Sequence, residues 1–197
     1  PFPALRTLSK AVFLDDDGGF ISTLKLVLSS KLVGSFHTDR ESAMNVLAAS
    51  AQAMGRERDA IGGIVAAQSH QADSPQAVSL AVQYLDDPGR CNLVGALVVD
   101  YAMPGEDGIS FCERVGTPGL QRMLLTGHAN DSIAVAAFNQ GLIERFVPKM
   151  SEPWRTGAAD IVRALVDRSA ARRGEPLLAC VDEPLRRMLA DPGAGRS

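Results

Sequence analysis

The sequence predicts an α/β fold, in which a doubly wound, five-stranded parallel sheet carries helices on both faces. Three observations predict it. Five short apolar runs have the composition of buried strands, and each is followed by a segment with apolar residues at helical spacing. This alternation favours a parallel sheet, because parallel neighbours need a crossover connection, usually a helix. The length of 197 residues suffices for one such domain with additions.

The third apolar run is the clearest of the strand candidates. It is a nearly continuous series of Val and Leu, which is typical of a strand buried on both faces. It ends in Asp100, and a Met-Pro-Gly turn follows. The alternation leaves several strand orders open. The five predicted strands are residues 10–14, 32–36, 93–99, 121–125 and 143–147.

Five segments between and after the strands have helical spacing. The second is expected to begin at Thr38 or Asp39, because Thr38 and Glu41 match the capping-box pattern. The predicted helices are residues 20–28, a helix from 38 or 39 to about 54, and residues 109–115, 131–140 and 154–172.

The segment before the third strand is too long for a minimal fold of this class. Eighty-five positions separate Asp15 from Asp100, whereas two helices, two strands and their connections need only about 50. We therefore expect a helical insert at about residues 55–91, made of helices 61–68 and 75–85. A break at residues 174–176 should precede a last helix near 184–189. The predicted domains are residues 8–173 and an extension over 174–197.

Composition excludes several other classes of protein. A net charge of −3 gives no electrostatic reason to expect binding to nucleic acid or to a membrane surface. No apolar run reaches the roughly 18 residues of a membrane span, and no signal peptide opens the chain. The three cysteines suit neither a metal site nor a disulfide framework, which predicts a reducing, cytoplasmic setting. Because the first residue is Pro1, the chain is consistent with a piece of a longer protein.

Chemistry-bearing residues follow four of the predicted strands. Asp15 to Asp17 follow the first strand, Asp100 the third, Thr126 the fourth and Lys149 the fifth. In a parallel sheet these ends share one edge, so the side chains can converge. Carboxylates gathered in one pocket repel one another, and Mg²⁺ bound by oxygen atoms relieves the repulsion. An aspartate beside Mg²⁺, a lysine and a hydroxyl group is suited to accept a phosphoryl group.

The strand ends resemble the five landmarks of the response-regulator receiver domain of two-component signalling. The resemblance covers about residues 10–171, with the insert as an interruption, and it implies a flavodoxin-like fold with strand order 2-1-3-4-5. The motifs that carry it are Leu14-Asp15-Asp16, Val99-Asp100 with Met103-Pro104-Gly105 and Asp107-Gly108, Leu125-Thr126-Gly127, and Phe146-Val147-Pro148-Lys149.

The same resemblance implies a role for each matched residue. Asp100 would accept phosphate from a sensor histidine kinase or a phosphotransfer protein, so the chain would be a signalling phosphoacceptor and not an enzyme. The ligands of Mg²⁺ would be Asp15, Asp16, Asp100 and the backbone carbonyl of Ala102. Thr126 and Lys149 would contact the phosphoryl group, and Phe146 would be the aromatic switch residue.

Two features depart from the receiver pattern. Receivers usually carry proline directly after the lysine, whereas Met150 follows Lys149 here. The insert is also atypical, and it offers a surface for a homodimer or for partner choice. Residues 170–197 are too short for a DNA-binding unit. Output is therefore expected through a downstream protein or an output domain outside this chain.

Two alternative functions stay open at the level of the sequence. Asp15-Asp16-Asp17-Gly18 fits the opening motif of haloacid-dehalogenase-like phosphatases. In that alternative Asp15 is the nucleophile and Asp17 the general acid of a Mg²⁺-dependent phosphohydrolase, but Asp100 and its loop have no role. The other alternative is a receiver-like interaction module that does not switch by phosphorylation.

Overall fold

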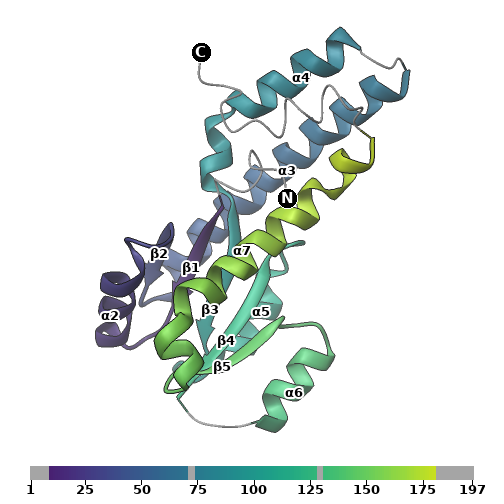
Figure 1. Cartoon of the computed structure of the whole chain (residues 1–197). Coiled ribbons are helices and arrows are strands. Elements are labelled where there is room, and N and C mark those ends of the chain that lie inside the picture. The colour runs from purple at the N-terminus through teal and green to yellow at the C-terminus, as the bar shows by residue number, and fades with distance from the viewer. Residues whose placement is uncertain (1–8, 71–73, 128–130, 181–197) are drawn as a thin grey trace. The chain divides into compact units, whose positions relative to one another are not determined.

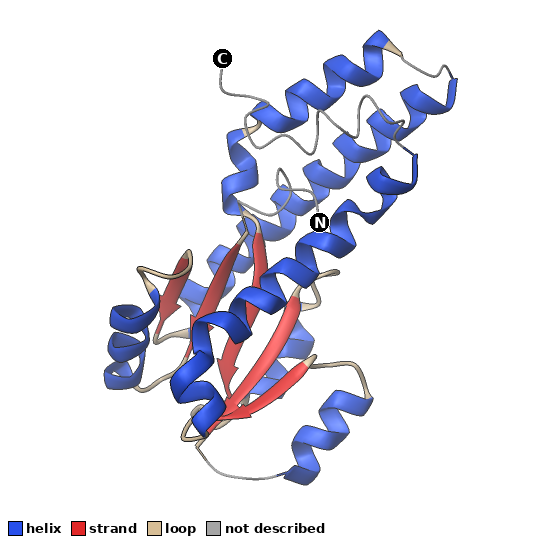
Figure 2. Ribbon diagram, viewed as in Figure 1, coloured by secondary structure: helices blue, strands red, loops and turns tan. Residues whose placement is uncertain are grey.

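A five-stranded, all-parallel sheet forms the centre of the computed structural model, which describes residues 9–70, 74–127 and 131–180 (Figures 1 and 2). The strand order is β2-β1-β3-β4-β5, which confirms the doubly wound α/β fold and the order that the resemblance implied. The strands are β1 (Lys10–Leu14), β2 (Gly34–His37), β3 (Val94–Asp100), β4 (Gln121–Thr126) and β5 (Arg145–Pro148).

Because all five strands are parallel, their carboxyl ends lie at one edge of the sheet. Leu14 of β1 pairs with Val99 of β3, so Asp15 and Asp100 each stand one position beyond a paired residue. Asp100 pairs in turn with Leu125 of β4. All seven residues of β3 are buried, as expected for a central strand covered on both faces.

Helices cover both faces of the sheet, and successive strand residues point to opposite faces. One core contains Phe13, Val98 and Met123 from the sheet, packed against α2 and α7. The other contains Val12, Leu97 and Leu124, packed against the first turns of α3 and against α5 and α6. The helices are α2 (Gly18–Leu28), α3 (Arg40–His70), α4 (Pro75–Asp86), α5 (Gly108–Val115), α6 (Asp131–Asn139) and α7 (Glu152–Cys180), with a 3₁₀ helix at Pro88–Asn92.

The chain divides into two compact units. The sheet unit comprises Lys10–Ala49 and Val94–Ser169. The helical unit contains the described residues of Ser50–Leu93, together with Ser9 and residues 170–180. The predicted division of the chain at residue 174 stays a prediction. Across the described residues, no helix is long and apolar enough to cross a membrane.

A buried polar network joins three helices within the helical unit. The Tyr84 hydroxyl of α4 donates to Glu57 Oε1 of α3 at 2.9 Å. The Arg173 Nε of α7 lies 2.9 Å from Glu57 Oε2, and both of these charged side chains are almost completely buried. Breaking a buried ion pair of this kind leaves a buried charge without a partner. We therefore expect the pair to favour this arrangement of α3, α4 and α7 over others, while it adds little net stability.

Two predicted breaks are absent from the helices. The helix expected to end near residue 54 continues to His70, so α3 includes the segment assigned to a first helix of the insert. The reason is a continuous buried face that two polar residues conceal in the sequence, Ser50 and Glu57. Buried residues recur at intervals of three or four along this face of α3: Leu47, Ser50, Ala53, Glu57, Ile61 and Ile64.

The predicted break at residues 174–176 is likewise wrong, because α7 extends to Cys180. Proline inside a helix removes one backbone hydrogen bond, but the remaining bonds can sustain the helix across it. Non-helical backbone occurs instead at Gly157. The helix predicted near 184–189 lies outside the described residues.

Candidate functional site

Three carboxylates meet at the carboxyl edge of the sheet. Asp15, Asp16 and Asp100 each present an oxygen within 4.8 Å of the others. Asp15 and Asp100 are buried, with exposed fractions of 2% and 4%, whereas Asp16 is exposed. The pairing of β1 with β3 brings the two buried carboxylates together. The structure therefore gathers all three predicted carboxylate ligands in one place.

Lys149 points into this acidic cluster from the end of β5. Its ammonium Nζ lies 2.6 Å from Asp15 Oδ2 and 3.0 Å from Asp100 Oδ1. The backbone N–H of Lys149 donates to the carbonyl of Thr126 at 2.8 Å, which extends the pairing of β5 with β4 beyond Pro148. Lys149 thus reaches both carboxylates although Met150, which is exposed, follows it in place of proline.

Phe20 of α2 is a third neighbour of the lysine, which the sequence reasoning assigned only to the apolar face of a helix. The Lys149 Nζ lies 4.7 Å from the centre of the Phe20 ring. An ammonium group over an aromatic face is attracted by the ring quadrupole. The contact therefore helps to hold the lysine over the acidic cluster.

Burial and ion pairing act in opposite directions on the ionisation of this site. Burial is the largest influence on Asp15 and raises the pKa of its carboxyl group above 3.8, although Lys149 and the Asp17 N–H oppose it. Burial acts to lower the pKa of Lys149, but hydrogen bonds and charges of Asp15 and Asp100 outweigh it and raise that pKa above 10.5. The lysine is therefore charged at neutral pH and stabilises the buried carboxylates.

The remaining predicted site residues lie in β4 and β5 and in the loop after β3, and they differ in burial. Thr126 is the last residue of β4 and is buried, one position beyond the residue that pairs with Asp100. Ala102 is exposed in the loop after β3. Phe146 is half-buried in β5 and packs against the core on the α3, α5 and α6 side. The roles of these three residues stay predictions.

The loop that follows Asp100 returns at once to the end of β3. The carbonyl of Tyr101 accepts hydrogen bonds from the Met103 N–H at 3.2 Å and the Gly108 N–H at 3.0 Å. Gly108 begins α5, and a Cβ atom at this position would lie 2.2 Å from the carbonyl oxygen of Asp100. Only glycine allows so close an approach. Asp107 caps α5 by accepting from the Ser110 N–H at 2.8 Å.

The donor set fits a hard divalent cation. The acidic cluster offers carboxylate oxygens and no sulfur or imidazole ligand, and Mg²⁺ prefers oxygen ligands and keeps part of its water shell. Asp16 is exposed, so one side of the cluster is open to water. Asp17 lies outside the cluster. Its carboxylate accepts from the N–H groups of Gly19 at 2.8 Å and Phe20 at 3.1 Å, and so caps α2.

Comparison with known proteins places the fold. No family model matches this sequence, and no curated protein matches it. Among solved structures, the response regulator LqsR of Legionella pneumophila is 24% identical with a TM-score of 0.63, over 99% of this chain and 56% of that one. This chain thus spans a little over half the length of LqsR.

Shorter solved structures are covered almost completely by the match. The signal receiver domain of an HD domain-containing protein from Pseudomonas fluorescens Pf-5 is 17% identical with a TM-score of 0.53, over 83% of this chain and 98% of that one. A protein described as an adenylate cyclase from Rhodopirellula baltica is 20% identical with a TM-score of 0.52, over 87% and 98%. The fold of this chain is that of response-regulator receiver domains, which confirms, for the fold, the resemblance seen in the sequence motifs.

Proposed function

We propose that this chain is a phosphoacceptor receiver, phosphorylated on Asp100 by the phosphohistidine of a sensor histidine kinase or a phosphotransfer protein. The observation that supports it most is the convergence of Asp15, Asp16 and Asp100 with the Lys149 ammonium at the carboxyl edge of a receiver-type sheet. A buried carboxylate beside a cation and a metal-binding cluster is suited to nucleophilic attack on phosphorus.

The reaction is a transfer between two nucleophiles. A carboxylate oxygen of Asp100 forms a bond to phosphorus as the P–N bond of phosphohistidine breaks. The imidazole leaves with the electron pair and then takes up a proton. Asp15, Asp16, Asp100 and the Ala102 carbonyl would hold Mg²⁺, which neutralises charge on the phosphoryl oxygens. The Lys149 ammonium, now between the carboxylates, would bind a phosphoryl oxygen.

Phosphorylation changes the charge at the end of β3. A carboxylate with one negative charge becomes an acyl phosphate with nearly two. On this proposal Thr126 moves toward the phosphoryl group and Phe146 turns inward, which changes the surface of α6, β5 and α7. The signal passes to a downstream protein, a second copy of the chain or an output domain outside it. The site of action is the cytoplasm.

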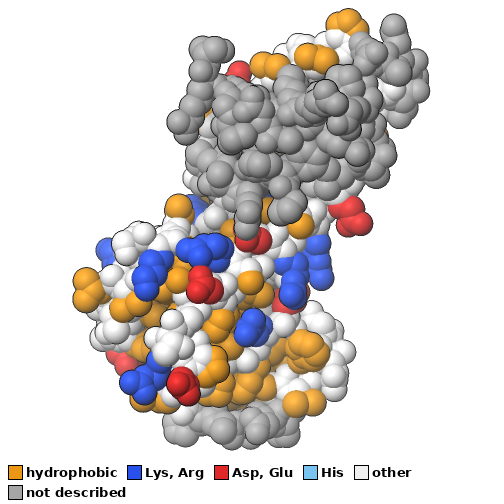
Figure 3. All heavy atoms as spheres, viewed as in Figure 1, with side chains coloured by type: hydrophobic (Ala, Val, Ile, Leu, Met, Phe, Trp, Pro, Cys, Tyr) orange, Lys and Arg blue, Asp and Glu red, His pale blue; other side chains and the backbone are white. Residues whose placement is uncertain are grey.

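The described residues on the face shown in Figure 3 give no support for a nucleic-acid partner. On the face shown in Figure 3, basic and acidic side chains of the described residues are interspersed with apolar ones. Nucleic-acid recognition uses a concentrated basic surface. The mixed pattern and the net charge of −3 favour a protein partner.

Incubation with acetyl phosphate and Mg²⁺, followed by intact-mass and peptide analysis, tests the proposal. We expect one phosphoryl adduct that maps to Asp100 and disappears in Asp100→Asn or after addition of a chelator. Asp160→Asn is the matched control, because this carboxylate is 82% exposed and pairs only with Arg163 in the described structure. An adduct on any other residue, or none in the wild type under these conditions, contradicts the proposal.

The phosphohydrolase alternative makes a different prediction for the same assay. It requires phosphate release that depends on Asp15 and Asp17 and not on Asp100. The helix cap formed by Asp17 argues against this alternative, since its carboxylate oxygen already accepts from two backbone N–H groups of α2 and lies outside the acidic cluster. A non-switching module would give neither an adduct nor phosphate release.

A further inference from the structure

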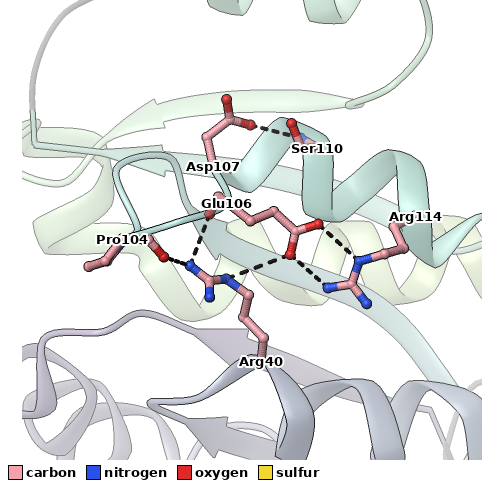
Figure 4. A network of polar contacts seen from close by, with 6 residues as sticks. All are labelled: Arg40, Pro104, Glu106, Asp107, Ser110 and Arg114. Atoms are coloured by element: carbon pink, nitrogen blue, oxygen red, sulfur yellow. Dashed lines mark hydrogen bonds and ion pairs between the residues drawn. The ribbon is translucent and has the colours of Figure 1, made fainter.

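The loop between β3 and α5, residues 101–107, is bound by an arginine from a distant part of the sequence. Arg40, the first residue of α3, donates from Nη2 to the carbonyls of Pro104 and Glu106, the latter at 3.2 Å (Figure 4). Its Nε lies 3.7 Å from the Glu106 carboxylate. One guanidinium thus contacts two backbone carbonyls and one side chain of the loop.

These contacts match what a guanidinium group can do. Its planar array of N–H donors can bind several acceptors at once, and hydrogen bonds from a charged donor are stronger than neutral ones. The backbone of this loop includes a glycine, and contacts on either side of a glycine restrict its conformational freedom. Gly105 stands between the two bound carbonyls with a φ of +82°, a left-handed conformation that the chain adopts easily only at glycine.

A second arginine in the same network provides an internal comparison. Arg114 of α5 forms a bidentate pair with Glu106, at 2.9 Å from Nε and 2.7 Å from Nη2. This pair lowers the pKa of Glu106, mainly through the Arg114 hydrogen bond, so the carboxylate is ionised at neutral pH. Among the described residues, Arg114 binds the carboxylate of Glu106, whereas Arg40 also binds backbone carbonyls of the loop (Figure 4).

We propose that Arg40 is a positioning residue that fixes the path of the loop 101–107 and thereby the place of the Ala102 carbonyl, which the proposed function assigns to Mg²⁺. The cause is the link from α3 to the carbonyls on either side of Gly105, which removes freedom from the backbone between Asp100 and α5. The consequence for Mg²⁺ affinity rests on the proposed function. The effect of Arg40 on the order of the loop in the metal-free protein is independent of that function.

Amide hydrogen exchange of the metal-free protein, read by mass spectrometry, tests whether Arg40 orders the loop. The Met103 and Gly108 amides bond to the Tyr101 carbonyl, so they report on the fold of the loop. For Arg40→Gln we expect exchange in this loop to accelerate about tenfold, as lost charge-assisted bonds imply. For Arg114→Gln, the matched control, we expect less than a twofold change. Arg40→Lys should be intermediate, because a lysine can still donate to one carbonyl.

Calorimetric titration with Mg²⁺ tests whether Arg40 also strengthens Mg²⁺ binding. Arg40→Gln should weaken Mg²⁺ binding about five- to tenfold, with Arg114→Gln within twofold of the wild type. Thermal unfolding shows that each variant is folded. Equal exchange in the Arg40→Gln and Arg114→Gln variants, or unchanged exchange in Arg40→Gln, overturns the positioning role. If the wild type binds no Mg²⁺, the proposed function fails, and the exchange comparison still decides the role of Arg40.

Discussion

Replacing Lys149 by methionine should make the stability of this protein depend on Mg²⁺. The substitution keeps a long side chain but removes the ammonium that lies 2.6 Å from Asp15 and 3.0 Å from Asp100. Both carboxylates have side chains that are at most 6% exposed, so water can replace the lost cation only in part. The variant would therefore keep two neighbouring, buried negative charges.

The size of the effect follows from the burial of the pair. Removing one partner of a buried ion pair typically costs about 3–5 kcal/mol, and we expect the lower figure because the Lys149 side chain is 16% exposed. For a chain of this size a loss of about 3 kcal/mol corresponds to a decrease in Tm of roughly 6 to 12 °C. Saturating Mg²⁺ should restore most of it by binding the folded state, and at a hundred times Kd that gain is about 2.7 kcal/mol.

The loss should also depend on pH. Burial already raises the pKa of Asp15 in the folded protein, and removal of the lysine raises it further. A carboxyl group whose pKa is higher in the folded state loses stability as the pH rises from its unfolded value, near 3.8, through the folded one. The Tm deficit of the variant should therefore be smaller at pH 5 than at pH 8.

Thermal unfolding by circular dichroism, with and without 10 mM Mg²⁺, checks these expectations. Lys25→Met is the control, because Lys25 is an exposed residue of α2 and should change Tm little in either condition. Our reasoning is refuted if Lys149→Met unfolds within about 2 °C of the wild type at pH 8 without metal. It is equally refuted if Mg²⁺ raises the Tm of the wild type more than that of the variant.

Three further predictions concern the loop, the helical unit and the cysteine core. Gly108→Ala should lose about 2–3 kcal/mol in urea unfolding, because its Cβ would lie 2.2 Å from a backbone carbonyl oxygen, whereas Gly127→Ala, with no atom of the described residues within 4 Å, should not; equal losses would contradict this. Arg173→Met should lose about 3 kcal/mol by leaving Glu57 buried and unpaired, and adding Glu57→Leu should recover most of that loss; additive losses in the double variant would argue against the pair. Burial raises the pKa of the Cys112 thiol to about 12, so Ellman's reagent at pH 8 should modify it only after unfolding in a variant in which Cys91 and Cys180 are replaced by serine; rapid labelling of this folded variant would show that the core is open.

The sequence predicts the sheet well and the long helices poorly, for one physical reason. Every residue of β3 is buried and nearly all of them are apolar, so the sequence predicts this strand without knowledge of the elements that pack against it. Helix α3 buries Ser50 and Glu57 on its packed face, and Glu57 is accommodated only because Tyr84 and Arg173 supply its partners. Such compensation comes from residues far away in the sequence, and no local period reveals it.

The candidate site divides in the same way. Asp15, Asp100 and Lys149 lie at the carboxyl ends of strands, and these ends share one edge of a parallel sheet. The contact of Phe20 with Lys149 depends on how α2 is rotated about its axis. The contacts of Arg40 depend on the path of the loop through Gly105. Neither can be read from the spacing of residues in the sequence. A signal does exist for both residues, since each lies in the first turn of the helix that follows a strand ending at this edge.

The charge of the acidic cluster sets an order of events. Three carboxylates against one ammonium leave the pocket with a formal charge of −2 before any ligand arrives. Under the proposed function the phosphoryl donor is an anion, so it would meet repulsion at close range until a divalent cation neutralises the pocket. Under this proposal, binding of the cation would precede productive encounter with the donor. Under the proposed function, the free Mg²⁺ concentration would then set the fraction of molecules that are ready to react with a donor.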